Sequence, residues 1–326
     1  MHVGWLIVVC MAMVAFINKL ICFWCRSKVC LVGKTALITG AASGMGMQTA
    51  LALAAKGCRI IVADLVNIEE AVKKIKSITH NPHIIGKSVD LGSLKSVRQF
   101  AKNILETEPK LDLLMCNAGV GNYRIRIETV DGLEKTMQVN YFSHFLLTHL
   151  LLGLLKKSSP SRIVFTSSEA AFLSSFKVDE LNPNEEYFQK ILTAFNGGVY
   201  SNSKLAVTAA VRSFAKRIDG TGVKIYAVHP GVVKTSFISN TISKDKNYLL
   251  GILFMSYLYI FGKTPEEGAQ TLIHVAHSDE VENDSGKSFL EGMRIPDLPQ
   301  LTNRFCEDIW QATIKILKME SHEIAC

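Results

Sequence analysis

Short apolar segments rich in β-branched residues alternate with helical stretches along most of this chain, and this order restricts the fold more than any other feature. The predicted strands are 34–39, 59–63, 83–89, 111–116, 162–167 and 223–228, and the predicted helices are 44–56, 68–78, 93–107, 131–157, 199–218 and 265–277. This order predicts the α/β class, with a single doubly wound, Rossmann-like parallel sheet and helices on both faces. Sheets of this type bind ligands at the carboxyl ends of their strands.

The chain begins with a long apolar run. Residues 3–25 carry one charge, Lys19, and a helix of this length can cross the roughly 30 Å hydrocarbon core of a bilayer. A cleaved secretory signal is the alternative, but no small-x-small cleavage site closes the run. We predict an N-terminal membrane-anchoring helix with a basic flank over residues 1–30 and one catalytic domain over residues 31–326.

The charge distribution predicts topology and partners. Basic residues follow the apolar run and the first acidic residue is Asp64, so the positive-inside bias predicts a catalytic domain that faces the cytosol. The anchor type favours the endoplasmic reticulum membrane. The net charge of +7 suits an anionic membrane surface, and no basic run with interleaved aromatic residues indicates a nucleic-acid partner. A homo-oligomer stays open.

Cysteine and histidine residues form no recognisable disulfide or metal pattern. Cys22 and Cys25 make a C-x-x-C, but no second pair or histidine cluster completes a zinc site. His144 and His149 lie in one predicted helix without sharing an i,i+4 face, which is typical of core or interface histidines. We predict no metal site.

A glycine-rich turn joins the first strand to the first helix. In TGAASGMG, residues 39–46, Gly40, Gly44 and Gly46 allow a pyrophosphate to approach the helix N-terminus, with Ser43 and Met45 between them. The spacing differs from the G-x-G-x-x-G fingerprint. Alone, the segment fits an ordinary turn equally well.

Asp64 ends the second strand, twenty residues after Gly44. A carboxylate at this position can accept hydrogen bonds from both hydroxyls of an adenosine ribose. A 2′-phosphate would meet like charge there, and neither Ser43 nor Leu65 supplies a compensating cation. NAD is therefore favoured as the cofactor, with NADP not excluded. The alternative is a solvated aspartate at a strand end.

Two further strands end in polar residues. Asp90 ends the third strand, and the fourth runs into Asn117, Ala118 and Gly119, which leave room for an adenine-ribose unit or form a generic turn. Asn140 lies inside an apolar predicted helix, where asparagine is a poor helix former and a buried amide needs partners. It is either satisfied structurally or faces the site.

Tyr200 and Lys204 lie one turn apart at the start of a predicted helix. A phenol that titrates near pH 10 can act as a base only if a nearby cation stabilises the phenolate. Tyr259 and Lys263 have the same spacing, but they lie in an apolar segment that follows no strand-end serine. Ser167 and Ser168 end the fifth strand before Tyr200 and favour the first pair.

The ordered set of motifs resembles the short-chain dehydrogenase/reductase family over residues 33 to about 290. The set comprises TGxxxGxG at 39–46, NAG at 117–119, Asn140, Ser168, Tyr200 with Lys204, and PGVVKT at 230–235. The apolar N-terminus, KTPEEGAQ at 263–270 and a GKSF strand at 286–289 are similar to the membrane-bound, retinol dehydrogenase-like branch.

The resemblance implies roles for the catalytic residues. Tyr200 would be the acid/base, and Lys204 would lower its pKa and bind the nicotinamide ribose. Ser168, favoured over Ser167 by the family spacing, would hold the substrate oxygen. Asn140 would hold a water that links Lys204 to solvent.

Further residues would bind the cofactor. Asp90 would meet the adenine, Thr235 would meet the nicotinamide carboxamide, and Pro230 and Gly231 would line the same site. Two positions depart from the family: Cys116 replaces the first asparagine of NNAG, and Asp64 replaces the basic residue found nearby in many retinal reductases. The second departure puts NADP-dependent retinal reduction in doubt.

The predicted reaction is hydride transfer between the cofactor and an alcohol or carbonyl compound. Residues 236–262, where the family builds its substrate lid, are largely apolar, which together with the anchor favours a retinoid, steroid or fatty alcohol. An alternative is a membrane-anchored, non-catalytic scaffold that retains the dinucleotide-binding fold. A sugar-nucleotide epimerase is disfavoured because the chain lacks a long C-terminal substrate domain.

Overall fold

A computed structural model describes residues 22–121, 125–174, 176–193, 198–234 and 262–326 of the chain. Eight strands form one sheet in the order β3-β2-β1-β4-β5-β6-β7-β8. Neighbouring strands are parallel except β7 and β8, which form an antiparallel pair at one edge. The strands are β1 Thr35–Thr39, β2 Arg59–Asp64, β3 Ile84–Ser88, β4 Leu113–Cys116, β5 Ser161–Thr166, β6 Val223–His229, β7 Ser288–Leu290 and β8 Met293–Ile295.

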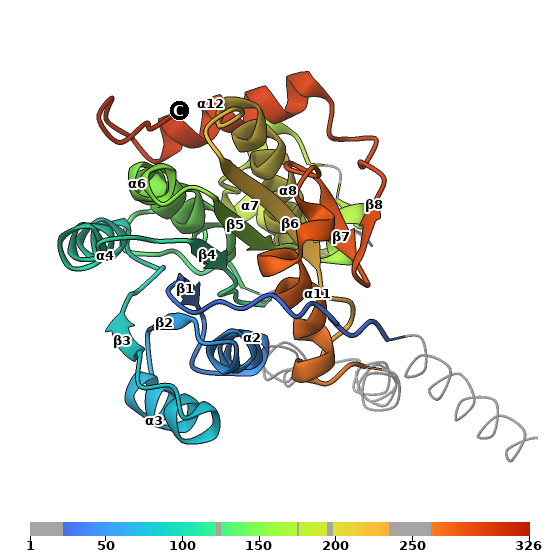
Figure 1. The fold of residues 1–326 in the computed structure, drawn as a ribbon. Helices are drawn as coiled ribbons and strands as arrows, with labels where there is room; N and C mark the ends of the chain where they lie inside the picture. The colour runs from blue at the N-terminus through green and yellow to red at the C-terminus, as the bar shows by residue number, and fades with distance from the viewer. Residues whose placement is uncertain (1–21, 122–124, 175, 194–197, 235–261) are drawn as a thin grey trace, which may run out of the picture.

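Helices cover both faces of the sheet (Figure 1). Two apolar cores lie on the two faces of the sheet. One face packs on α4, α6, α8 and α12, and the other packs on α2, α3 and α11. The helices are α2 Gly44–Ala55, α3 Ile68–Thr79, α4 Leu94–Thr107, α5 Lys135–Met137, α6 Ser143–Lys157, α7 Glu185–Thr193, α8 Gly198–Arg217, α11 Pro265–His277 and α12 Asn303–Ile316. This arrangement confirms a single Rossmann-like α/β domain.

Strand β1 shows why the sheet is buried on both sides. All five of its residues are buried, and Leu37 belongs to one core while Ala36 and Ile38 belong to the other. Successive side chains of a strand point to opposite faces. A strand of apolar residues throughout therefore requires helices above and below it.

The structure differs from the predicted elements at three places. The helix predicted over 131–157 begins at Lys135 and contains a π-helical turn, Gln138–Phe142, between α5 and α6. Strand β8 and helices α7 and α12 had no predicted counterpart. β8 has three residues and no buried side chain, so it carries no alternating apolar signal. The predicted parallel sheet thus has an antiparallel edge.

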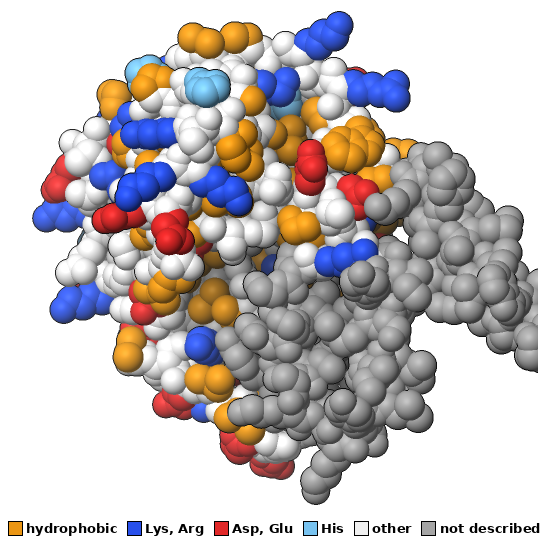
Figure 2. All heavy atoms as spheres, turned by 90° about the horizontal axis from the view of Figure 1, so that it is seen from below, with side chains coloured by type: hydrophobic (Ala, Val, Ile, Leu, Met, Phe, Trp, Pro, Cys, Tyr) orange, Lys and Arg blue, Asp and Glu red, His pale blue; other side chains and the backbone are white. Residues whose placement is uncertain are grey.

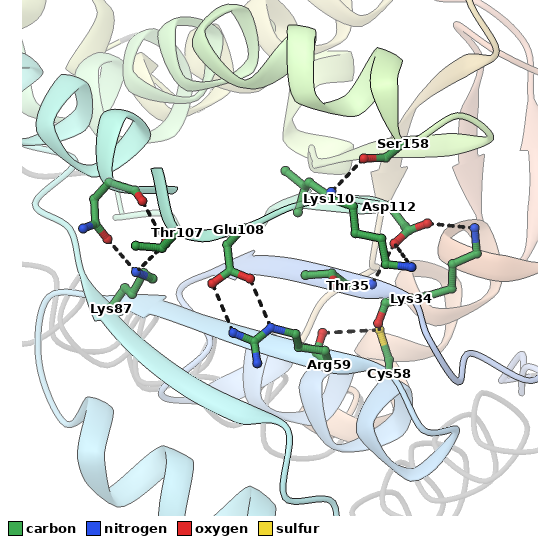
Figure 3. Close-up of polar contacts among 12 residues, drawn as sticks. Lys34, Thr35, Cys58, Arg59, Lys87, Thr107, Glu108, Lys110, Asp112 and Ser158 are labelled. Atoms are coloured by element: carbon green, nitrogen blue, oxygen red, sulfur yellow. Dashed lines mark hydrogen bonds and ion pairs between the residues drawn. The ribbon is translucent and has the colours of Figure 1, made fainter. Parts of the chain in front are cut away.

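Charged residues tie the amino ends of the strands together, at the sheet edge opposite the ligand-binding end (Figure 3). Asp112, just before β4, accepts hydrogen bonds from the Lys34 Nζ at 2.7 Å and from the Thr35 backbone nitrogen at 2.9 Å. Arg59 at the start of β2 donates two hydrogen bonds, each 3.1 Å, to the Glu108 carboxylate. These contacts align β1, β2 and β4 at this edge.

Residues 22–30 form an extended strap along α11 and the β7–β8 hairpin. The Phe23 ring lies 5.1 Å from the His274 ring, and a methyl group at Gly292 would come within 2.4 Å of Phe23. The Cys25 backbone nitrogen donates to Gln270 Oε1 at 3.2 Å. We therefore propose that the catalytic domain includes this strap, which the sequence grouped with the anchor.

Within the described ranges, no helix combines the length and apolar character needed to span a bilayer. The apolar part of the predicted anchor, up to residue 21, and almost all of the predicted substrate lid at 236–262 lie outside these ranges. Over the described surface visible in Figure 2, acidic and basic side chains are interspersed. The described part of that face therefore shows no continuous basic patch.

Candidate active site

A cavity of about 1170 Å³ lies at the carboxyl ends of the strands, where this topology places ligands. Its walls bring together almost all the residues singled out in the sequence, from segments that are up to about 190 positions apart in the chain. Those that line it are Gly40, Ser43, Gly44, Met45, Gly46, Asp64, Asp90, Asn117, Ala118, Gly119, Ser167, Ser168, Tyr200, Lys204, Pro230 and Gly231.

The glycine-rich turn is closely packed against the rest of the site. Gly40 has a φ of +66°, and a methyl group there would lie 2.8 Å from Ala118 Cα. A methyl group on Gly46 would lie 2.1 Å from the Gly40 carbonyl oxygen. Neither glycine can be replaced without moving backbone, because contacts this short do not occur between real Cβ atoms and backbone.

The N-terminus of α2 fits an anionic group. Ser43 is the N-cap residue, but its side chain makes no capping hydrogen bond to the helix, and the first turn contains no acidic residue. The N–H groups at the start of a helix lack helical partners and carry partial positive charge. At the wall of this cavity, such a turn can hold a phosphate of a dinucleotide.

Asp64 and Asp90 are held by backbone amides. One Asp64 oxygen accepts from the Ala42 nitrogen at 2.9 Å, and the other accepts from the Leu65 nitrogen at 2.8 Å. Asp90 Oδ1 accepts from the Gly92 nitrogen at 2.7 Å. Strand β3 ends at Ser88 rather than at Asp90, so Asp90 belongs to the loop that follows.

Thr39 fixes the NAG turn to the end of β1. Its hydroxyl accepts hydrogen bonds from the backbone nitrogens of Asn117 at 2.9 Å and Ala118 at 3.0 Å, and lies 2.9 Å from His144 Nε2. The Asn117 amide donates to the Thr39 carbonyl at 3.0 Å. His144 is therefore a buried core residue that supports the turn.

Asn140 lies in the π-helical turn, and its amide is satisfied by protein groups. Oδ1 accepts from the Val120 nitrogen at 2.8 Å, while Nδ2 donates to the Val120 carbonyl and to Ser203 Oγ, both at 3.1 Å. A methyl group on Gly119 would lie 3.3 Å from Asn140 Oδ1 and 3.7 Å from Lys204 Nζ. Asn140 thus connects the segment after NAG to α8 and flanks Lys204.

The two strand-end serines have different surroundings. Ser167 is buried, and its hydroxyl donates to the Lys204 carbonyl at 3.0 Å and lies 3.1 Å from Thr208 Oγ1. Both serines line the cavity, but Ser168 is only half-buried and hydrogen-bonds the Tyr200 hydroxyl. Burial raises the pKa of that phenol, and the hydrogen bond from Ser168 opposes the rise. This geometry favours Ser168 as the serine that can reach a ligand.

Helix α8 presents Tyr200 and Lys204 to the cavity. Lys204 Nζ lies 5.6 Å from the centre of the Tyr200 ring and donates to the Thr166 carbonyl at 2.8 Å. Burial raises the pKa of Tyr200 to about 12 and lowers the pKa of Lys204 to about 8, because both charged forms are desolvated. At neutral pH, Tyr200 is therefore a protonated phenol. Lys204 is held in place by Thr166, and its pKa is close enough to neutral that changes in its surroundings can alter its protonation.

The remaining predicted positions are only partly described. Thr235 and Tyr259 lie outside the described residues. Lys263, the lysine of the second Tyr-x-x-x-Lys match, forms an ion pair with Glu291, and its backbone bonds to Val232 and Lys234. The backbone of Lys263 thus pairs with the residues that follow β6 directly.

The sequence did not single out Glu169, Phe172 or Leu173, which also line the cavity. All three belong to a 3₁₀ helix, Glu169–Leu173, that begins directly after Ser168. Their position just beyond a strand-end serine is a signal that sequence reading could have used. In the part of the chain that the structure describes, no three His, Cys, Asp or Glu side chains are grouped to hold a metal.

The chain is similar to known proteins along most of its length. The family model for short chain dehydrogenases matches residues 34–179 and 192–246. Retinol dehydrogenase 12 of Bos taurus is 38% identical over 296 residues, which cover 90% of this chain and 89% of that protein. Retinol dehydrogenase 14 of Homo sapiens is 39% identical, with 79% of this chain and 78% of that protein covered.

Solved structures show the same fold at lower sequence identity. An uncharacterised protein from Mycobacterium paratuberculosis has a TM-score of 0.69 at 23% identity, and the match covers 91% of this chain and 98% of that one. The RhlG/NADP active-site complex from Pseudomonas aeruginosa has a TM-score of 0.61 at 24% identity, covering 80% and 95%.

Proposed function

Because the chain belongs to the short-chain dehydrogenase family and is retinol dehydrogenase-like, we propose that it transfers hydride between a nicotinamide cofactor and a lipophilic alcohol or carbonyl compound. Its relatives support a dinucleotide-dependent oxidoreductase that acts on alcohols. The observation that carries the proposal is the cavity itself, where Ser168, Tyr200 and Lys204 lie on one wall and the glycine-rich turn lies on another.

The bound nicotinamide would supply the hydride acceptor or donor, and the protein would handle the proton. In alcohol oxidation, Tyr200 reacts as phenolate and takes the proton of the substrate hydroxyl, and Ser168 holds the substrate oxygen. Lys204 is fixed through Thr166, and its positive charge opposes the burial that raises the pKa of Tyr200. In carbonyl reduction the protonated phenol acts directly as the acid.

NAD is the cofactor that Asp64 favours. Its carboxylate lies at the cavity wall, held by two backbone amides, and would repel a 2′-phosphate while it accepts hydrogen bonds from ribose hydroxyls. We assign the phosphate-binding role to the turn at Gly40, Gly44 and Gly46. Asp90 and the NAG turn would meet the adenosine, and Thr235 the carboxamide.

We further propose a membrane-bound enzyme. Residues 1–21 would anchor it in the endoplasmic reticulum membrane with the catalytic domain in the cytosol, and residues 236–262 would form a lid over an apolar substrate such as a retinoid, steroid or fatty alcohol. Asn283 is exposed and opens an N-x-[ST] sequon. Glycosylation of Asn283 in cells would contradict the cytosolic topology.

The direct test measures NADH or NADPH formation by the detergent-solubilised full chain over retinoid, steroid and long-chain alcohols. We expect turnover with NAD⁺ above that with NADP⁺. Tyr200→Phe should lower kcat by at least about a hundredfold, because it removes the proton acceptor, while NADH still binds. Wild-type protein that binds NADH but turns over none of these alcohols would instead favour the non-catalytic scaffold.

A further inference from the structure

Glu169 places a carboxylate in the wall of the proposed substrate cavity. It follows Ser168 directly and is half-buried. The side chains that line the cavity beside it include Phe172, Leu173 and Val232. Partial burial raises the pKa of Glu169, because it removes part of the hydration of the carboxylate, while Lys263 opposes the rise and Glu291 adds to it.

The described charges near this carboxylate are paired with each other. The groups that act on it electrostatically are Lys263 and Glu291. Lys263 is already paired with Glu291, and Glu291 also accepts a hydrogen bond from the Phe23 backbone nitrogen of the strap at 3.2 Å. Among the described contacts, no hydrogen bond or ion pair reaches the Glu169 side chain.

Glu169 is not needed to hold the local structure. It is the first residue of the 3₁₀ helix Glu169–Leu173, and the N-terminus of that helix is capped by Ser168, whose Oγ accepts from the Ala170 nitrogen at 3.2 Å. A partly desolvated carboxylate in a cavity wall, with no protein donor among the described residues, can accept a hydrogen bond from a ligand that displaces its water. Lys263, the cation that acts on Glu169, is itself paired with Glu291.

We propose that Glu169 is a specificity-determining residue that accepts a hydrogen bond from a second hydroxyl group on an otherwise apolar alcohol substrate. The inference rests on the proposed function and narrows its substrate class. The reacting hydroxyl lies at Ser168 and Tyr200, and the second hydroxyl lies at the adjacent wall, toward Lys263. Few, well-placed polar groups in an apolar pocket commonly set ligand orientation in this way.

The test compares kcat/KM for straight-chain primary alcohols with that for α,ω-diols of the same length, over a series of lengths, with the full chain in detergent. A diol has two equivalent reactive ends, which alone would double its kcat/KM. In the wild-type protein we expect the kcat/KM of the diol to exceed that of the monoalcohol by more than this factor. Glu169→Leu should lower the diol-to-monoalcohol ratio by about tenfold or more, because a hydrogen bond to a charged acceptor is lost. Glu169→Gln, which keeps an acceptor oxygen, should fall between.

Glu186→Leu is the matched control, because Glu186 is exposed on α7 and is not among the residues that line the cavity. It should leave the ratio unchanged. NADH binding and the thermal unfolding midpoint report whether each variant is folded. If Glu169→Leu does not fold, the isosteric Glu169→Gln decides.

Two results overturn the inference in distinguishable ways. Turnover of both substrate classes with the same ratio in wild type, Glu169→Gln and Glu169→Leu would contradict the role of Glu169 and leave the proposed function intact. No turnover of any alcohol, with NADH still bound, would contradict the proposed function and this inference with it.

Discussion

At the scale of single residues, burial opposes the charged forms of both members of the proposed catalytic pair. It favours the neutral forms of both Tyr200, whose pKa is raised to about 12, and Lys204, whose pKa is lowered to about 8. Lys204 Nζ lies 5.6 Å from the centre of the Tyr200 ring. A phenolate on Tyr200 and an ammonium on Lys204 would therefore stabilise each other in a site of low polarity. The phenolate that oxidation requires therefore depends on Lys204 keeping its proton.

Asp64 carries the prediction about cofactor choice. Asp64→Asn removes the negative charge and keeps one acceptor oxygen, so it can retain one of the two hydrogen bonds that the Ala42 and Leu65 amides donate to the carboxylate. We expect the ratio of Kd for NADPH to Kd for NADH to fall by about tenfold, because repulsion of the 2′-phosphate is lost. Quenching of protein fluorescence by each dinucleotide measures the ratio. An unchanged ratio would show that Asp64 does not discriminate.

At the scale of elements, the π-helical turn decides what Asn140 can do. The helix predicted over 131–157 gives no partner for the buried side-chain amide of Asn140. The turn brings Asn140 onto the backbone of Val120 and onto Ser203, the residue before Lys204. π-Helical turns often occur at functional sites, and this one couples α8 to the segment after β4.

Asn140→Ala tests that coupling. The substitution leaves the Val120 N–H and C=O without their partner, so we expect about 2–3 kcal/mol less unfolding free energy. We also expect a loss of kcat, because Lys204 loses a flanking group. Chemical denaturation and steady-state kinetics measure the two effects. Ser203→Ala removes the acceptor of one Asn140 hydrogen bond and the donor to the Tyr200 carbonyl, but it leaves the Val120 contacts in place and should cost less. Equal losses in both variants would argue against a special role of the Val120 contacts.

At the scale of the whole molecule, buried histidines make stability depend on pH. Burial lowers the pKa of His144, His149, His229 and His277 to about 4. Between pH 6.5 and 4 the unfolded chain therefore binds more protons than the folded one. Stability is fully present above pH 6.5 and falls as the pH drops toward 4, by up to about 1.4 kcal/mol per pH unit for each histidine.

We expect the thermal unfolding midpoint to fall by several degrees from pH 7 to pH 5.5, as followed by circular dichroism. His149→Gln should flatten this dependence, since it removes one titrating group and keeps an acceptor for the Ala325 nitrogen. His322→Gln is the control, because His322 is exposed. A midpoint that stays constant over this range in the wild type would contradict the argument.

Local pattern was enough for the six main predicted strands, most of the helices and the chemistry-bearing motifs. Apolar periodicity reports which side of an element is buried, and residues such as Asp64, Ser168 and Tyr200 were readable because they stand at element ends. Local pattern failed for β8, which is too short to alternate, and for the π-helical turn, whose Asn140 binds Val120, a residue of another segment.

By itself, the sequence determined the order of the elements, the Rossmann-like class and the set of residues that could carry hydride-transfer chemistry, because these depend on neighbours a few positions apart. Only the tertiary structure decided that Ser168 hydrogen-bonds the Tyr200 hydroxyl and that Asn140 binds Val120 and Ser203. It also decided that the strap and Lys263 both contact Glu291, close to Glu169. Those outcomes depend on burial and on contacts between segments up to 268 positions apart. No local pattern encodes such contacts, because the free energy of each depends on how the rest of the chain has packed.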